Sequence, residues 1–323
     1  MTSPYHRGER EAQERAGLRR KAEISGRAIR GTVPPVAAAF LTEQRLLVAG
    51  AADDSGDLWA TVLTGPAGFL RAPDERSLFI AAGPAPADPL SAVLERPARL
   101  GMLAIDTATR RRMRMNGTAH PRDGGFLVHL DQVVANCPKY IQRRTPPEPG
   151  CGPPPRPSRA RRSDRLDDAQ RRLLAAADTF FIATADEHGR ADASHRGGDP
   201  GFLQVLSPTR LRWPDYTGNA MFLTLGNLLV NPRAGLVVPD YATGATVHLT
   251  GTARTVWDAG RAGGPGDAET GRAVEFTVTG VAELPGTLPA GWSPPEMSRF
   301  NPPVQRAGAP RDGTPEAGAP RAA

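Results

Sequence analysis

An internal repeat constrains the fold of this 323-residue chain more than any other feature. Three short blocks in the first half recur in the second half, each displaced by 133 or 134 residues. The matched blocks are Gly65–Phe69 with Gly198–Phe202, Arg99–Leu103 with Arg233–Val237, and Asn116–Ala119 with Thr250–Ala253. Similarity at a constant spacing indicates a duplicated structural unit. We therefore expect two diverged copies of one fold, with coincidence in a Gly- and Ala-rich chain as the alternative.

Each copy shows the same succession of short apolar segments. Apolar and polar residues alternate with period two in 126–130, 246–250 and 274–278, which is typical of strands with one buried face. Each copy is expected to begin with a strand pair, continue with a short helix and end with three strands. The strand pairs are 58–63 with 76–80 and 190–194 with 209–213; the helices are 89–96 and 221–231; the later strands are 98–105, 112–119, 125–134, 234–240, 245–253 and 273–283. This pattern predicts a small, mostly antiparallel barrel in each half.

Glycine and proline set the expected boundaries. With 35 Gly and 33 Pro, the chain is unsuited to an all-helical bundle. A flexible loop is expected over 260–272, and an amphipathic helix over 8–30. The expected organisation is an N-terminal helical segment over 1–30, a first copy over 31–144, a Pro-rich linker over 145–163, a second copy over 164–300 and a disordered tail over 301–323.

Composition also bears on the class of protein. No apolar run approaches the roughly 20 residues of a membrane span, and the N-terminus lacks a secretory signal, so we expect a cytoplasmic protein that does not bind membranes. The net charge of +6 comes almost wholly from Arg, with Lys21 and Lys139 as the two lysines. A coding bias explains that usage, and we do not expect nucleic-acid binding. Cys137 and Cys151 form neither a disulfide framework nor a metal site.

A first polar cluster lies in the second copy. Ser194, His195, Arg196 and Gly197 stand in succession just before a second glycine. Arg offers two parallel donors to a phosphate, Ser adds another, and Gly lets a ligand approach the backbone closely. The cluster indicates a phosphate site, with a polar strand end leading into a turn as the alternative.

A second polar cluster precedes the expected helix of the second copy. Asp215, Tyr216, Thr217 and Asn219 form a turn suited either to N-capping or to binding phosphate at the start of a helix. Asn227 lies eight residues further on, within an apolar helix, where its amide is either buried and satisfied or directed at a ligand.

The two copies retain complementary polar residues. The first-copy positions aligned with Ser194–Arg196 are Thr61–Leu63, which lack the cluster. Conversely, Arg112, Arg114 and Asn116 lie on one face of a first-copy strand, and their second-copy counterparts are Thr246, His248 and Thr250. This pattern predicts one ligand site between the copies; drift beside an exposed basic strand is the alternative. Lys139 is either a further cation of that site or a surface lysine. Cys137 is expected to be a small buried residue, and its reactivity stays open.

These motifs together resemble the pyridoxamine 5′-phosphate oxidase-like family of FMN-binding split barrels, and in particular its two-copy subgroup. The resemblance rests on DASHRGGDPGF, PDYTGNAMFLTLGNLLVNPRAGL, TRRRMRMNG and NCPKYIQRR, with HRGERE at the start and EMSRFNP at the end. It covers roughly residues 6–304 apart from the linker. It implies a mainly β fold with minor α, built as tandem split β-barrels with short flanking helices. In this family FMN lies between barrels, so the two copies would stand in for two subunits.

By that resemblance, Ser194, Arg196 and Thr217 would hold the FMN phosphate, and residues 112–116 with Lys139 would reach in from the other copy. The first copy lacks a second equivalent site, so one FMN per chain is expected. The residues of a pyridoxal-phosphate substrate site are not recognisable, so that oxidase activity is not expected.

The resemblance implies an FMN-dependent reductase or oxidase of unknown substrate. A small-molecule redox substrate, NAD(P)H or a separate reductase as electron donor, and either a monomer with an internal pseudo-dimer or a homodimer are expected. The alternatives are an F420-binding barrel, a non-catalytic nucleotide-binding sensor, and a haem-binding barrel. The candidate axial ligands for haem are His195, His248 and Cys137.

Overall fold

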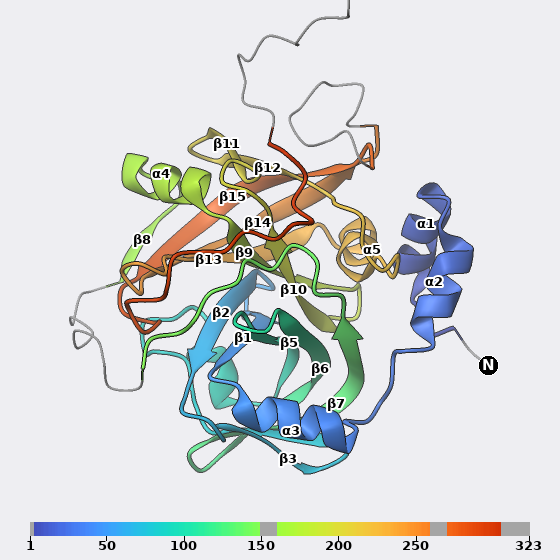
Figure 1. Cartoon of the computed structure of the whole chain (residues 1–323), viewed down its shortest axis with the longest axis vertical. Coiled ribbons are helices and arrows are strands. Elements are labelled where there is room, and N and C mark those ends of the chain that lie inside the picture. The colour runs from blue at the N-terminus through green and yellow to red at the C-terminus, as the bar shows by residue number, and fades with distance from the viewer. Residues whose placement is uncertain (1–2, 149–159, 259–269, 305–323) are drawn as a thin grey trace, which may run out of the picture.

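The strands form two sheets with the same order. The computed structural model describes residues 3–148, 160–258 and 270–304. Within these residues the first sheet runs β2-β1-β5-β6-β7-β4-β3 and the second runs β10-β9-β13-β14-β15-β12-β11, with antiparallel neighbours throughout. A short further strand, β8, pairs with β15. The mainly β fold of tandem split barrels is thereby confirmed, and Figure 1 shows one barrel stacked on the other.

The elements of the first copy follow three N-terminal helices. The helices are α1 (Arg7–Arg15), α2 (Arg19–Gly26) and α3 (Pro35–Glu43). The strands are β1 (Leu46–Ala52), β2 (Leu58–Thr64), β3 (Leu70–Asp74), β4 (Ser77–Ile80), β5 (Ala98–Asp106), β6 (Arg111–Arg122) and β7 (Gly125–Asn136), with the 3-10 turn η1 (Val93–Glu95) between β4 and β5.

The second copy repeats this order after β8 (Arg161–Ser163) and α4 (Asp168–Ala176). Its strands are β9 (Thr179–Ala185), β10 (Ala191–Gly197), β11 (Gln204–Ser207), β12 (Arg210–Pro214), β13 (Arg233–Pro239), β14 (Thr246–Val256) and β15 (Ala273–Leu284), with α5 (Leu223–Val230) between β12 and β13. Matching strands begin 133 to 135 residues apart up to β14. The duplication inferred from three short blocks therefore extends along most of each barrel.

The two barrels pack through equivalent strands. A separate apolar cluster, which includes Val62, Leu103, Phe181 and Val237, fills the space between β2-β1-β5 and β10-β9-β13. Each barrel also has a core of its own. The interface thus buries the same face of both copies, as in a symmetric dimer made from one chain.

The structure corrects the expected strand pairs. Segments 58–63 and 76–80 are strands, but β2 pairs with β1, whereas β4 pairs with β3 and β7. In the same way, β10 pairs with β9, and β12 pairs with β11 and β15. The sequence pattern did not single out β1 and β9, because both faces of these strands are buried and no polar residue alternates along them.

Two expected helices also differ. The single helix over 8–30 is instead α1 and α2, which are separated at Gly17, where a φ of 67° ends the first helix. In place of a helix over 89–96, the first copy has the short turn η1, bounded by Pro89 and Pro97. The helix expected over 221–231 is present as α5.

Parts of three expected features lie outside the described residues. These are most of the Pro-rich linker with Cys151, most of the loop over 260–272, and the tail beyond residue 304. The domain boundaries therefore stay predictions. Among the described residues, none of the helices is long and apolar enough to cross a membrane.

Candidate functional site

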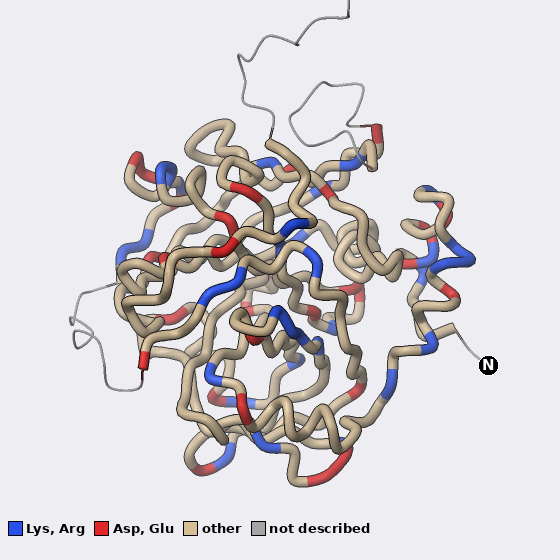
Figure 2. Tube along the Cα trace, in the orientation of Figure 1, with Lys and Arg blue, Asp and Glu red and all other residues tan. Residues whose placement is uncertain are grey.

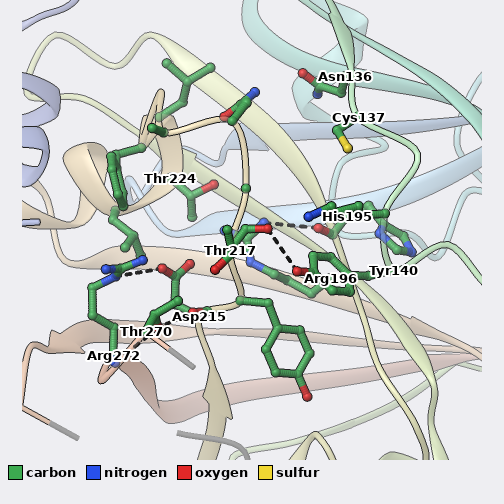
Figure 3. Close-up of a pocket in the computed structure, with 18 of the residues that line it drawn as sticks. Asn136, Cys137, Tyr140, His195, Arg196, Asp215, Thr217, Thr224, Thr270 and Arg272 are labelled. Carbon is green, nitrogen blue, oxygen red and sulfur yellow. Dashed lines mark hydrogen bonds and ion pairs between the residues drawn. The ribbon is translucent and has the colours of Figure 1, made fainter. Parts of the chain in front are cut away.

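A cavity of about 430 Å³ lies where the two barrels meet. This volume falls within the roughly 300–1,000 Å³ of small-molecule sites. Both copies line the cavity: β6 and the segment after β7 come from the first copy, and β10, the β12–α5 loop and the residues before β15 come from the second. Figure 3 shows side chains from both copies converging on it, and Figure 2 shows basic segments at the centre of the view, between the barrels. We call it the interface cavity.

Strand β6 directs two guanidinium groups at the interface cavity. Arg112 and Arg114 both line it, as their spacing of two residues on a strand predicts. Arg111 directly precedes Arg112 in sequence and points to the opposite face, where its guanidinium lies 4.6 Å from the centre of the Phe40 ring. The alternation of β6 therefore separates two binding candidates from a structural arginine.

Arg112 is a buried cation in a positively charged environment. Its Nη1 lies 2.8 Å from Nδ1 of His195, and its Nε has no hydrogen-bond partner among the described residues. Within the same residues, neither Arg112 nor Arg196 forms an ion pair with a carboxylate. Burial, reinforced by the charges of Arg114 and Arg196, lowers the pKa of Arg112 to about 9. The guanidinium groups in the wall therefore outnumber the carboxylates, which Asp215 represents.

The pKa values of Arg196 and His195 are also lowered. Burial lowers the pKa of Arg196, with Arg114 adding to the shift and Asp215 opposing it. Burial, followed by the charges of Arg112 and Arg196, holds the pKa of His195 well below its usual value. His195 is therefore neutral at pH 7, and its contact with Arg112 has Nδ1 as acceptor.

Ser194 holds Arg114 in position instead of lining the cavity. The Ser194 hydroxyl accepts a hydrogen bond from Nη2 of Arg114 and lies 2.8 Å from the hydroxyl of Thr224. Nε of Arg114 also lies 3.1 Å from Oδ1 of Asp192. Ser194 is 1 % exposed and does not belong to the cavity wall. The role that the structure suggests for it is to position Arg114.

The loop between β12 and α5 forms the opposite wall. Asp215, Tyr216, Thr217 and Asn219 all line the interface cavity, as expected from the sequence. Asp215 is tied to Arg272, whose Nε donates to Oδ2 at 2.9 Å. The carbonyl of Thr217 accepts a hydrogen bond from the hydroxyl of Tyr140 at 2.9 Å, so the first copy secures this loop (Figure 3).

The start of α5 is not capped by the polar turn that precedes it. The N-cap residue is Phe222, and within the described part of the chain no side chain caps the first turn through a hydrogen bond. Leu223, Thr224 and Leu225 line the interface cavity, so the first amide groups of α5 lie beside it. The N-capping interpretation of this turn is therefore wrong, and the amides of the helix remain available to an anion.

Backbone strain is concentrated around the same cavity. Among the described residues, four that are not glycine have positive φ, and three of these line the interface cavity: Tyr140 at 67°, Ala220 at 63° and Phe222 at 57°. Such conformations cost of order 1–3 kcal/mol each and are kept where the surrounding structure imposes them, often at functional sites.

The remaining predicted residues divide between two places. Gly197 and Lys139 line the interface cavity, and Nζ of Lys139 lies 5.4 Å from the centre of the Phe300 ring. Cys137 also lines it and is partly exposed, so it is not the buried residue expected. Asn116 and Asn227 instead line a second cavity.

Sequence reasoning missed several residues of the interface cavity. Lys21 comes from α2, and Thr270 and Arg272 precede β15. No local motif surrounds any of them, and only the fold brings them to the site. Tyr140 could have been found, because it belongs to the NCPKY segment that already contained Lys139.

The corresponding place in the other half is closed by buried contacts. His248, the counterpart of Arg114, has Nε2 2.7 Å from the Thr246 hydroxyl and Nδ1 2.8 Å from the carbonyl of Ala60. Thr61, the counterpart of Ser194, donates to the carboxylate of Asp88. Both nitrogens of His248 are engaged, so it is not available as an axial ligand. These contacts agree with one site per chain.

Residues 166–267 match the family model described as pyridoxamine 5′-phosphate oxidase. No curated protein matches the chain. Among solved structures, the chain is similar to a putative pyridoxamine 5′-phosphate oxidase from Lactobacillus delbrueckii, at 18% identity over 37% of this chain and 94% of that one, with a TM-score of 0.31.

It is also similar to HupZ from Group A Streptococcus, at 13% identity over 39% of this chain and 99% of that one, with a TM-score of 0.31. A third similar structure is an FAD binding protein from Mycobacterium smegmatis, at 15% identity over 38% and 98% of the two chains, with a TM-score of 0.28. These structural likenesses are too distant to indicate a ligand.

Proposed function

For a chain whose second half is of the pyridoxamine 5′-phosphate oxidase family, we propose that the interface cavity binds one FMN and that the protein is an FMN-dependent reductase or oxidase. The observation that supports this most directly is the convergence of Arg112, Arg114 and Arg196 from the two copies on one cavity. A phosphate dianion would offset the burial and the repulsion between neighbouring guanidinium groups that lower the pKa values of Arg112 and Arg196.

The donors of the cavity fit a phosphorylated ligand. The buried Nε of Arg112 lacks a partner among the described residues, and the first amides of α5 have no side-chain cap. In the proposed complex, Arg112 and Arg196 bind the phosphate together with the Thr217 turn. Ser194 and Asp192 hold the guanidinium of Arg114 in place through the contacts described above.

FMN, when bound, supplies the hydride-transfer chemistry, and the protein contributes binding, orientation and charge. Arg112, Arg114 and Lys139 would stabilise the negative charge that reduction adds to a ligand in this cavity. Neutral His195 accepts a hydrogen bond from Arg112 and so keeps the guanidinium of Arg112 directed at the cavity. In this proposal a small molecule is the redox substrate, and NAD(P)H or a separate reductase is the electron donor.

Adjacent arginines on β6 provide a matched test of FMN binding. We expect Arg112→Ala and Arg196→Ala each to weaken FMN binding roughly 10- to 100-fold, because a hydrogen bond to a charged group contributes about 1.5–3 kcal/mol. Arg111→Ala is the control, since its side chain lies on the other face of the strand against Phe40. FMN content after gel filtration and the Kd from flavin fluorescence are the measurements. Equal affinity in all three variants would contradict the assignment.

The absorbance spectrum of the purified protein tests the cofactor class. Flavin bands that bleach on anaerobic addition of NADPH would support an oxidoreductase. A Soret band would replace FMN by haem, and F420 binding without FMN binding would replace it by the deazaflavin. Bound FMN that no nicotinamide cofactor or reductase reduces would favour a sensor. A colourless protein that takes up none of these cofactors would refute the proposal.

A further inference from the structure

A second cavity, of about 540 Å³, adjoins the interface cavity. It is lined by the segment before α1 and by residues of α1, β5, β6, β7, β10 and α5, and therefore by both copies. Leu223 lines both cavities. Arg114 in the wall of the interface cavity contacts Asp192 in the wall of the second, with Nε 3.1 Å from Oδ1. We call this space the second cavity.

The wall of the second cavity contains two ion pairs, in each of which an arginine neutralises an aspartate. Arg99 contacts Asp131 with 2.9 Å between Nη1 and Oδ2. Arg190 contacts Asp186 with 2.6 Å between Nε and Oδ2. These four charges cancel in pairs, so the charge that the cavity presents to a ligand depends on its other acidic residues.

The other acidic residues of the wall are Glu9 and Asp192, of which Asp192 is also paired: its Oδ1 lies 3.1 Å from Nε of Arg114 and 3.5 Å from Nδ2 of Asn116. Both are buried, with 6 % and 4 % of their surface exposed. Burial, aided by the nearby charge of Asp192, raises the pKa of Glu9 to about 8. Burial also raises the pKa of Asp192, although Arg114 opposes the shift. Glu9 is therefore largely protonated at pH 7 while the cavity is empty, and its ionisation requires a further cation nearby.

Two acceptor atoms in this cavity have no donor among the described residues. They are Oδ2 of Asp192 and Oδ1 of Asn116, both buried. Nδ2 of Asn116 already donates to Gln132, with an N···O distance of 3.3 Å. A buried acceptor without a donor costs about 1–3 kcal/mol. The second cavity therefore suits a ligand that donates hydrogen bonds to these two atoms, and a positive charge on that ligand would also allow Glu9 to ionise.

An ammonium group fits these requirements better than a metal ion. It has three donors and one positive charge, and it is attracted to carboxylates. Among the described residues, no group of three or more His, Cys, Asp or Glu side chains is arranged to hold a metal ion. Asn227 adds no free donor, because its amide donates to Thr184 at 2.9 Å while its oxygen contacts His6 at 2.9 Å.

We propose that the second cavity binds a small molecule through a protonated amine, which donates hydrogen bonds to Asp192 and Asn116 and is further attracted by the carboxylate of Glu9. The site is separate from that proposed for FMN and does not depend on its identity. Its ligand is an organic cation, whereas the interface cavity is suited to an anion.

Calorimetric titration of the full chain tests the proposal, with putrescine as the probe and 1,4-butanediol as the uncharged control of equal chain length. We expect putrescine to bind at least tenfold more tightly than the diol. Asp192→Asn keeps the shape of the side chain and removes its charge, so it should weaken putrescine binding tenfold or more; Glu9→Gln should weaken it by a smaller factor. Glu11→Gln is the control, because Glu11 lies on the same helix, is exposed and pairs with Arg15.

Equal affinity for putrescine and the diol, or no binding of putrescine at millimolar concentration, would overturn the proposal in the unmodified protein. Unchanged putrescine binding by Asp192→Asn would also overturn it. Thermal unfolding and FMN content, measured on every sample, separate loss of the amine site from loss of the fold or of FMN. A protein that binds putrescine but no FMN would refute the proposed cofactor and leave this inference intact.

Discussion

The packing of the two barrels depends on a pair of equivalent glycines, and their substitution gives a quantitative prediction. Gly101 in β5 and Gly235 in β13 are 134 residues apart and occupy the same position in each copy. A Cβ on Gly235 would lie 2.4 Å from the carbonyl oxygen of Leu58 and 2.5 Å from Cα of Trp59. A Cβ on Gly101 would lie 2.4–2.5 Å from backbone atoms of Asp192.

These overlaps involve backbone atoms, so no side-chain rotation can relieve them. Ordinary contacts of a Cβ begin at 3.4 Å, and the facing strands would have to separate by about 1 Å. Overpacking of a core by one methyl group typically costs 1–3 kcal/mol. Ala also restricts the unfolded chain more than Gly does, which stabilises the folded state by about 0.4–1 kcal/mol. The difference is about 0–2.6 kcal/mol, and because only backbone movement can relieve the overlap, we expect its upper part: Gly235→Ala and Gly101→Ala should each lower the free energy of unfolding by about 1–2.6 kcal/mol.

Urea denaturation followed by tryptophan fluorescence measures this change. Gly83→Ala is the control, because a Cβ at that position meets no atom within 4 Å and the backbone there has no positive φ. The control has no overlap to offset the reduced freedom of the unfolded chain, so it should be as stable as the parent protein or more stable by up to about 1 kcal/mol. A Gly235→Ala variant as stable as the control would refute the inference that close contact between strands holds the barrels together.

Two further predictions concern buried charges. The pKa of Glu9 is raised to about 8 in the folded state, so the folded chain binds more protons than the unfolded chain between about pH 4.5 and pH 8. The free energy of unfolding should therefore fall by a few kcal/mol as the pH rises through this range. Urea denaturation at a series of pH values measures this change, and Glu9→Gln should remove it. Asp178 and Arg144 form a buried ion pair with N···O distances of 3.0 and 2.5 Å, so Asp178→Asn should lower the free energy of unfolding by about 3–5 kcal/mol. Asp168 pairs with Arg171 at the surface, so Asp168→Asn should lower it by less than about 1 kcal/mol. Equal midpoints of thermal unfolding for the two variants would contradict this.

Local pattern was sufficient for the repeat and for most of its strands. The matched blocks around Gly101 and Gly235 occupy the same positions in the two barrels, and alternation located strands such as β7 and β15. Pattern failed for β1 and β9, because strands buried on both faces carry no alternation, and for the pairing partners of β2 and β10. The family match to residues 166–267 agrees with motifs that were recognisable in the sequence.

The candidate site shows the same division. The sequence by itself determined that the two copies carry complementary polar residues, because the alignment of the repeat and the two-residue period of a strand are local properties. Tertiary structure alone decided which of these side chains share a cavity. Ser194 is adjacent to His195, yet it faces Arg114 behind the wall, and Asn116 opens into the second cavity. The reason is physical: a side chain's neighbours across an interface depend on how two barrels pack, and no short segment of either barrel encodes that packing.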